Sequence, residues 1–175
     1  MIWDEIAAEA AAESSLWVGA LRPLDQRRQL EVFSPLAEPR YAPGVETIYE
    51  GYLTHYGVPR LFAPPDDDVA LLLGDYLYAH GLVRIASFGD TDAVADLSEL
   101  ISLCSQLRAE GAGGDGALWA ASAALLGAGE RLDTARAALR LRGEAGPLEA
   151  AARAAAGDEA VDRALGLHDE LNAVR

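Results

Sequence analysis

Histidine, cysteine and clustered acidic side chains are the groups in this chain that could carry out chemistry. The three histidines, His55, His80 and His168, do not show any spacing typical of a metal site. The single cysteine, Cys104, excludes both an internal disulfide and a cysteine-based zinc site. It falls on the apolar side of a predicted helix without a neighbouring cation, so we expect an unreactive buried thiol. His168 stands near the C-terminus, where we expect a solvated side chain.

Asp66, Asp67 and Asp68 are three consecutive acids that could in principle hold a hard cation. Consecutive helical residues point about 100° apart, so their carboxylates cannot converge on one ion. We expect them to cap the start of a helix, where carboxylates accept hydrogen bonds from free N–H groups and complement the helix dipole. The glycine-rich segment 111–116 follows no predicted strand, so a phosphate-binding loop is not expected there.

The charge composition excludes several classes of function. The chain has no lysine, and its 14 basic residues oppose 28 acidic ones, giving a formal net charge of −14. Without lysine there is no amine for a Schiff base or for a Walker-A phosphate clamp. A surface this acidic repels phosphate backbones, which excludes nucleic-acid binding through a basic surface. A single cysteine also suits a reducing compartment.

The elements that would position these side chains are helical almost throughout. Val94, Leu97 and Ile101 recur at helical spacing, and no segment shows the alternation typical of strands. A chain of 175 residues is long enough for one core. We therefore expect an all-α helical bundle in a single domain over residues 1–175. The predicted helices are Asp4–Gly19, Leu24–Val32, Val45–Tyr56, Val69–Phe88, Ala93–Arg108, Ala117–Leu126, Glu130–Arg142, Pro147–Ala156 and Asp158–Val174.

Neither export nor membrane insertion is expected. The first residues include Asp4, Glu5 and Glu9, where a signal peptide has a basic start and then an apolar run. The longest weakly polar stretch, Ala117–Ala128, is 12 residues, whereas a bilayer span needs about 20. We expect a cytoplasmic protein with no transmembrane segment.

The segment from Leu71 to His80, Leu-Leu-Leu-Gly-Asp-Tyr-Leu-Tyr-Ala-His, resembles a helix of the trans-polyprenyl diphosphate synthase family. In that family, a Leu-x-Gly-Asp-aromatic-Leu-x-Ala run follows the first aspartate-rich motif. The resemblance covers residues 45–106, about a third of the chain. It implies a partial isoprenoid-synthase-like fold.

The family pattern can be laid on the chain from Gly74 without a gap. Glu46, Thr47 and Glu50 then fall where the family has Asp-Asp-x-x-Asp. The segment 55–59, His-Tyr-Gly-Val-Pro, falls on Arg-Arg-Gly-Lys-Pro, so the glycine and proline keep their places and the arginine pair is lost. The resemblance therefore implies that Glu46 and Glu50 are the remains of a magnesium site.

These departures from the family predict a chain without independent catalysis. In the family, two aspartate-rich motifs hold the magnesium ions that neutralise the leaving diphosphate, and arginines and lysines clamp the phosphates. Here every lysine is absent, the second aspartate-rich motif has no convincing counterpart, and the chain is little more than half the usual family length. We therefore expect no catalytic residue, no resident metal and no cofactor.

The best preserved segments are 69–88 and 93–108, whose counterparts in the family form the core of the subunit interface. The first is apolar nearly all round, which is typical of a helix that is central in a bundle or shared between subunits. Aromatic residues are favoured where subunits meet. The predicted interface consists of Leu73, Asp75, Tyr76, Leu77, His80, Val94, Leu97 and Ile101.

The leading hypothesis is a non-catalytic subunit that packs against a full-length prenyl synthase in isoprenoid biosynthesis. It would stabilise that partner or shape the tunnel in which the prenyl chain grows, as the short chains of heteromeric prenyl synthases do. A first alternative is a shortened prenyltransferase or diphosphate-binding enzyme that uses Glu46 and Glu50 with magnesium. A second is a homodimer that binds an isoprenoid or another lipid in an apolar cavity. A third is a decayed paralogue that retains only its fold.

Overall fold

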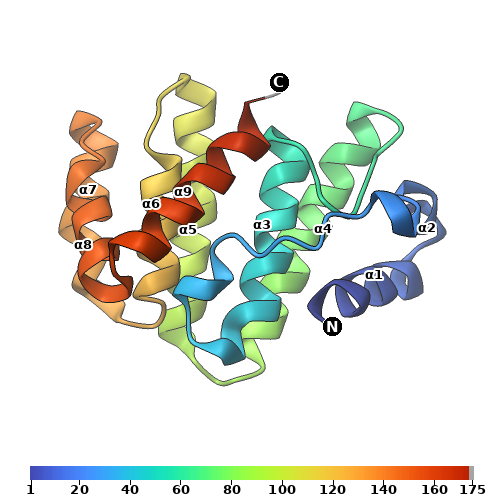
Figure 1. The fold of residues 1–175 in the computed structure, drawn as a ribbon, viewed down its shortest axis with the longest axis horizontal. Helices are drawn as coiled ribbons and strands as arrows, with labels where there is room; N and C mark the ends of the chain where they lie inside the picture. Colours follow the sequence, from blue (N-terminus) through green and yellow to red (C-terminus); the bar gives the residue numbers. More distant parts are fainter. Residues whose placement is uncertain (174–175) are drawn as a thin grey trace.

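The computed structural model describes residues 1–173, apart from the side chains of residues 129 and 130 (Figure 1). Its only β-type pairing in this range is an isolated bridge between Leu21 and Phe62, so the predicted all-α fold is confirmed. The α-helices are α1 (Ile2–Glu13), α2 (Ser15–Ala20), α3 (Ala42–Tyr56), α4 (Asp67–Ala86), α5 (Thr91–Glu110), α6 (Asp115–Ala124), α7 (Asp133–Arg142), α8 (Gly146–Ala156) and α9 (Asp158–Asn172). The 3-10 helices are η1 (Leu24–Gln26), η2 (Ser34–Leu36), η3 (Pro39–Tyr41) and η4 (Gly129–Leu132).

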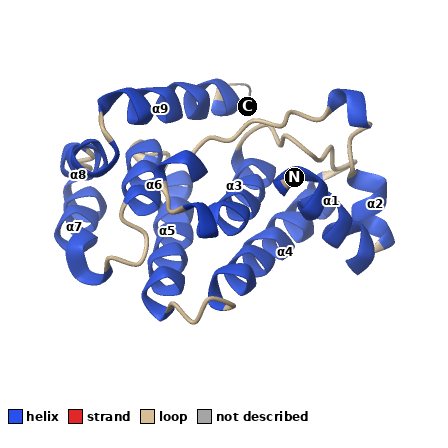
Figure 2. Ribbon diagram, turned by 60° about the horizontal axis from the view of Figure 1, so that its bottom comes forward, coloured by secondary structure: helices blue, strands red, loops and turns tan. Residues whose placement is uncertain are grey.

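The helices are arranged around the antiparallel pair α3 and α4. Figure 1 shows α1 and α2 on one side of this pair and α5 to α8 on the other. Helix α9 crosses the second group and reaches α3, with which it is in contact (Figure 2). The last predicted helix ends at Asn172, and Val174 lies outside the described residues.

Four glycines, two on each helix, explain why α3 and α4 form the most extensive helix pair. A Cβ atom at Gly74 would overlap the His55 ring, and one at Gly81 would overlap Ile48. Gly44 and Gly51 meet α4 from the other side. The glycine of the Gly-Asp run therefore has a packing role, since it lets two helix backbones approach closely.

The N-terminal segment differs from the sequence prediction. The expected helix Asp4–Gly19 is broken at Ser14, which has extended dihedrals and accepts a hydrogen bond on Oγ from the Leu16 N–H at 3.2 Å. Of the helix expected over residues 24–32, only the short 3-10 helix η1 forms, because the chain on either side of η1 is hydrogen-bonded to segment 60–61. Arg22 and Arg28 donate their backbone N–H groups to the carbonyls of Leu61 and Arg60. Tertiary pairing has overridden local helix propensity.

Two aspartates cap the starts of α4 and α5, and the cap of α4 lies in the three-acid run where the sequence predicts it. Asp66 Oδ1 accepts a hydrogen bond from the Val69 N–H at 2.8 Å, and Asp90 Oδ1 accepts one from the Ala93 N–H at 2.9 Å. Both are N-caps of the ordinary kind. The three-acid run therefore belongs to the start of α4.

Helix α4 is the one helix in the described part of the chain that is long and apolar enough to cross a membrane. This corrects the expectation that Ala117–Ala128 is the longest weakly polar stretch. Helices that pack inside soluble proteins pass the same test of length and composition, and a third of the most apolar window of α4 is buried. One such helix is weak evidence of a membrane span, so residues 1–173 contain no clear transmembrane segment.

Candidate functional site

The two glutamates that align with the family's magnesium site, Glu46 and Glu50, are fully buried and form ion pairs with one arginine. Arg60 Nη1 lies 2.5 Å from Glu46 Oε2, and Arg60 Nε lies 2.9 Å from Glu50 Oε2. All three side chains have no exposed surface. Burial alone would lower the pKa of Arg60, but the two carboxylates raise it above its ordinary value. The guanidinium is therefore permanently charged.

Backbone groups occupy the remaining carboxylate oxygens. Glu46 Oε1 accepts hydrogen bonds from the N–H groups of Val32 and Ser34, both at 3.1 Å, and Glu50 Oε1 accepts one from the Leu61 N–H at 2.7 Å. A magnesium ion needs carboxylate oxygens that are open to it and to water. These four oxygens already have donors, so the residues do not fit a magnesium site. Throughout the described chain, no group of three or more His, Cys, Asp or Glu side chains is placed to hold a metal.

Aromatic side chains fill the space next to this network, where the Arg60 guanidinium lies 5.0 Å from the centroid of the Tyr49 ring. Phe33 stacks on Trp119 with ring centroids 5.4 Å apart, and Tyr49 meets the edge of Trp119 at 4.9 Å. Tyr52 stacks on Tyr49 at 5.7 Å. All four rings are essentially inaccessible to solvent. These packed rings leave no open tunnel at this position in the bundle.

The chain's own N-terminus covers part of the predicted subunit interface. Leu73 and Leu77 are fully buried in a small core with Trp3, Ile6 and Trp17. We call residues 1–21 the N-terminal arm. Leu73 and Leu77 lie under this arm, so in this conformation they are not exposed to another chain.

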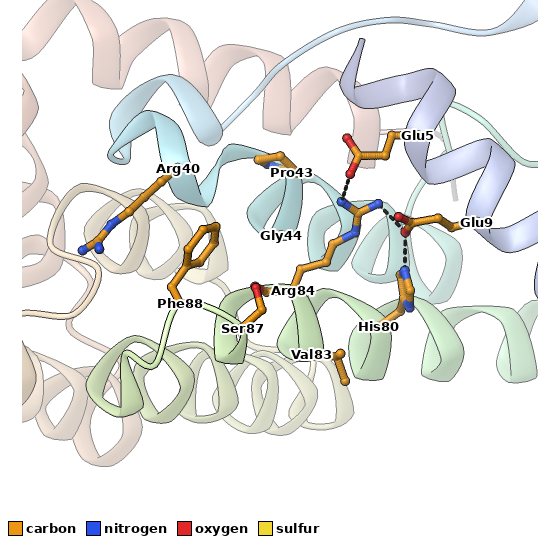
Figure 3. A pocket seen from close by; sticks show the side chains of 10 residues that line it. All are labelled: Glu5, Glu9, Arg40, Pro43, Gly44, His80, Val83, Arg84, Ser87 and Phe88. Carbon is orange, nitrogen blue, oxygen red and sulfur yellow. Dashed lines mark hydrogen bonds and ion pairs between the residues drawn. The ribbon is translucent and has the colours of Figure 1, made fainter.

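Tyr76 and His80 also contact the arm. Tyr76 stacks on Trp17 with a centroid distance of 5.7 Å and on His80 at 5.4 Å. His80 Nε2 contacts Glu9 Oε2, and Arg84 Nη1 lies 2.7 Å from Glu5 Oε1. Figure 3 shows Arg84 and His80 reaching from α4 towards these two glutamates of α1. The ion pairs fasten the arm along one side of α4.

A surface hollow of about 390 Å³ opens where these ion pairs meet α3 (Figure 3). Pro43, Val83 and Phe88 supply its apolar walls, and Arg40 stands at one side. Arg40 pairs with Glu38 at 3.0 Å and with Asp90 at 3.6 Å. Because the charged groups around the hollow already have partners within the chain, it presents no set of open ligand-binding groups.

The remaining predicted interface residues have different environments. Asp75 is exposed and pairs with His55 Nε2 at 3.2 Å. Leu97 is buried in the main core, whereas Val94 and Ile101 are partly buried against it. The eight residues therefore do not form one exposed surface, because four of them contact the arm, Asp75 is exposed beside His55, and the three on α5 pack in or against the main core.

A second polar cluster was not expected from the sequence. Asp115 at the start of α6 accepts a hydrogen bond from Arg108 Nη2 at 2.7 Å and contacts the Tyr52 hydroxyl. His168 places Nε2 3.4 Å from Asp115 and Nδ1 2.9 Å from the Tyr49 hydroxyl. His168 is only 3% exposed, which corrects the expectation of a solvated side chain. The cluster joins α3, α5, α6 and α9.

Electrostatics in this cluster favour the ionised carboxylate. Burial alone would raise the pKa of Asp115, but hydrogen bonds from His168 and Tyr52 and the charge of Arg108 hold it well below its ordinary value. Cys104 lies nearby, and burial raises the pKa of its thiol well above the usual range. The expectation that Cys104 is buried is confirmed, and a thiol with a raised pKa is a poor nucleophile at neutral pH.

No family model, curated protein or solved structure matches the chain. The resemblance to prenyl synthases thus stands on the sequence segment 45–106 alone.

Proposed function

We propose that the protein is a non-catalytic, prenyl-synthase-like helical subunit of the cytoplasm. In this role it associates with a full-length prenyl diphosphate synthase in isoprenoid biosynthesis. The observation that carries the proposal is the buried Glu46–Arg60–Glu50 network, which lies where the family alignment puts a metal site. An arginine that cannot lose its charge stands between the carboxylates, so they serve the fold rather than a diphosphate.

Two further observations support this function over the enzymatic alternative. The aromatic cluster around Trp119 occupies the bundle interior, where a synthase would need space for substrate. The glycines of α3 and α4 keep the helix pair tightly packed, so the part of the family pattern that survives is a packing pattern. A subunit that stabilises or reshapes a catalytic partner needs this scaffold and no metal.

The direct test is co-expression with the full-length prenyl synthase of the same cell, followed by sedimentation velocity on the purified proteins. We expect one heteromeric species and a change in the product length or thermal stability of the synthase. Persistent separation of the two chains at micromolar concentration would contradict the proposal.

A second measurement addresses residual catalysis. Calorimetric titration of the isolated chain with Mg²⁺, with and without an allylic diphosphate, should give no specific heat. Turnover of that diphosphate by the isolated chain would favour the enzymatic alternative instead.

A further inference from the structure

One side of α4 remains uncovered within the described chain. The outer face of α4 consists of five exposed residues, Leu72, Asp75, Ala79, Val83 and Ala86. Leu72 and Val83 are 55% and 64% exposed, high values for aliphatic side chains on a central helix. Figure 2 shows α4 along an edge of the molecule, with α3 on one side of it and no helix on the other.

The spacing of these residues is typical of a helix–helix contact. Successive members of the face are three, four, four and three positions apart, so they lie along one stripe of the helix, as the apolar residues of packed helices do. Four of the five are apolar, and the small Ala79 lies at the centre, where it permits close approach of a second helix. The face spans about 21 Å at the rise of an α-helix, enough for four turns of a partner.

The charges on this face and at its N-terminal end are acidic, whereas Arg40, which lines the same hollow as Val83, pairs with Glu38 and Asp90. Asp75 lies within it, and Asp66, Asp67 and Asp68 are exposed at its N-terminal end. Among the described residues no arginine pairs with any of these four, and the partner of Asp75 is His55. The cations on the neighbouring side of α4 are occupied, because His80 and Arg84 contact the glutamates of the arm.

Charge complementarity therefore selects the occupant. A second copy would bring the same acids and a charge of −14 against this face, and would offer Asp75 no cation. An anionic membrane would be repelled for the same reason. A helix with an apolar stripe flanked by arginine or lysine would bury the leucine and valine and pair with Asp75 and the three-acid run.

We propose that the outer face of α4 docks a basic amphipathic helix of a partner protein. This inference deepens the proposed function and rests on it for the role of the partner, while the kind of helix follows from the face itself. Burial of the apolar side chains of the face supplies the affinity. The acids orient the partner helix and speed its association.

The probe for the test is a synthetic peptide of about 18 residues with leucine at every third or fourth position and arginine beside the leucines. A second peptide of identical composition, permuted to remove the apolar stripe, controls for general attraction to an acidic protein. Calorimetric titration of the full chain should give one-to-one binding of the first peptide, with a Kd at least about tenfold lower than that of the second. Equal binding of the two peptides would overturn the proposal.

Variants locate the binding surface. Leu72→Glu and Val83→Glu should each weaken binding of the striped peptide by at least about tenfold. Leu141→Glu, at a leucine on α7 that is 75% exposed, should leave it unchanged. Each of these side chains is exposed, so circular dichroism and a thermal melt should show folded variants. Unchanged binding by both α4 variants would contradict the proposal.

The other occupants give distinct results. A dimer of the isolated chain that Val83→Glu abolishes would replace the partner helix with a second copy. Binding to anionic phosphatidylglycerol vesicles that Leu72→Glu abolishes would replace it with a membrane surface.

If the striped peptide binds as expected but no prenyl synthase associates, the docking surface stands and the proposed function fails. If the synthase associates equally well with both α4 variants, the docking surface fails and the proposed function stands.

Discussion

Arg60 and Glu46 form an ion pair from which water is excluded, with 2.5 Å between Nη1 and Oε2 and no exposed surface on either side chain. The same guanidinium donates to Glu50 Oε2 and to the Leu30 carbonyl, so one side chain joins α3 to the chain on both sides of it. Buried charges are tolerated when each is paired and hydrogen-bonded. The arrangement makes the network a requirement of the fold.

The Arg60→Met variant should be severely destabilised. It leaves two buried carboxylates without their cation, and breaking a buried pair in this way costs about 3–5 kcal/mol. Urea denaturation followed by circular dichroism measures the change in unfolding free energy. Arg28→Met is the matched control, because its pair with Glu170 joins two side chains that are 43% and 58% exposed. Similar losses in both variants would contradict the structural role of Arg60.

Gly74→Ala should destabilise the chain although alanine favours helices. The new methyl group would overlap the His55 ring between α3 and α4, and overpacking of this kind costs about 1–3 kcal/mol. Gly19→Ala in α2 is the control, since a Cβ there has no neighbour within 4 Å and should stabilise the helix by about 0.5–1 kcal/mol. Thermal melts show whether each substitution lowers or raises the stability of the protein. A Gly74→Ala variant more stable than the native protein would refute the close contact between α3 and α4.

The Cys104 thiol should be silent towards DTNB in the folded protein. It is 1% exposed, and burial raises its pKa, so both access and thiolate population are low. Full reaction of one thiol per chain is expected in denaturant. Rapid reaction under native conditions would show that α5 opens readily and that the core around Cys104 is less well packed than the structure shows.

Local features of the fold could be predicted from the sequence, and features that depend on distant contacts could not. The caps Asp66 and Asp90 and the extent of α5 follow from residue type and helical period. The role of Arg60 could not be predicted from the sequence, because this residue lies in a proline-bounded loop and its partners are 10 and 14 residues away. A pattern that is apolar all round shows that α4 must be covered, but it does not say by what. The N-terminal arm covers Leu73 and Leu77 and leaves Leu72 exposed.

The Asp115 cluster was missed for a similar reason. Asp115 follows a glycine-rich loop, and His168 stands next to two exposed acids, so each residue taken alone resembles surface. Their partners Tyr49 and Tyr52 lie within the predicted helix Val45–Tyr56, and nothing in the sequence sets them apart from its other residues. The two tyrosines lie three and six residues after Glu46 on α3. They indicate a buried polar cluster only once it is known that α9 packs against α3.

The same cluster predicts that the stability of the folded chain depends on pH. The pKa of Asp115 is held below its ordinary value in the folded chain, so the folded state favours the ionised carboxylate. Its contribution is therefore complete above the pKa of an unfolded aspartate, about 3.9, and is lost as the pH falls from there towards the folded pKa. Asp115→Asn should destabilise the chain at neutral pH, and the difference from the native protein should shrink below about pH 4. Urea unfolding across pH 2.5 to 7 measures both curves, with Asp169→Asn, an exposed acid on α9, as the charge-matched control. A constant difference between Asp115→Asn and the native protein over the whole range would mean that the carboxylate is not paired as the structure places it.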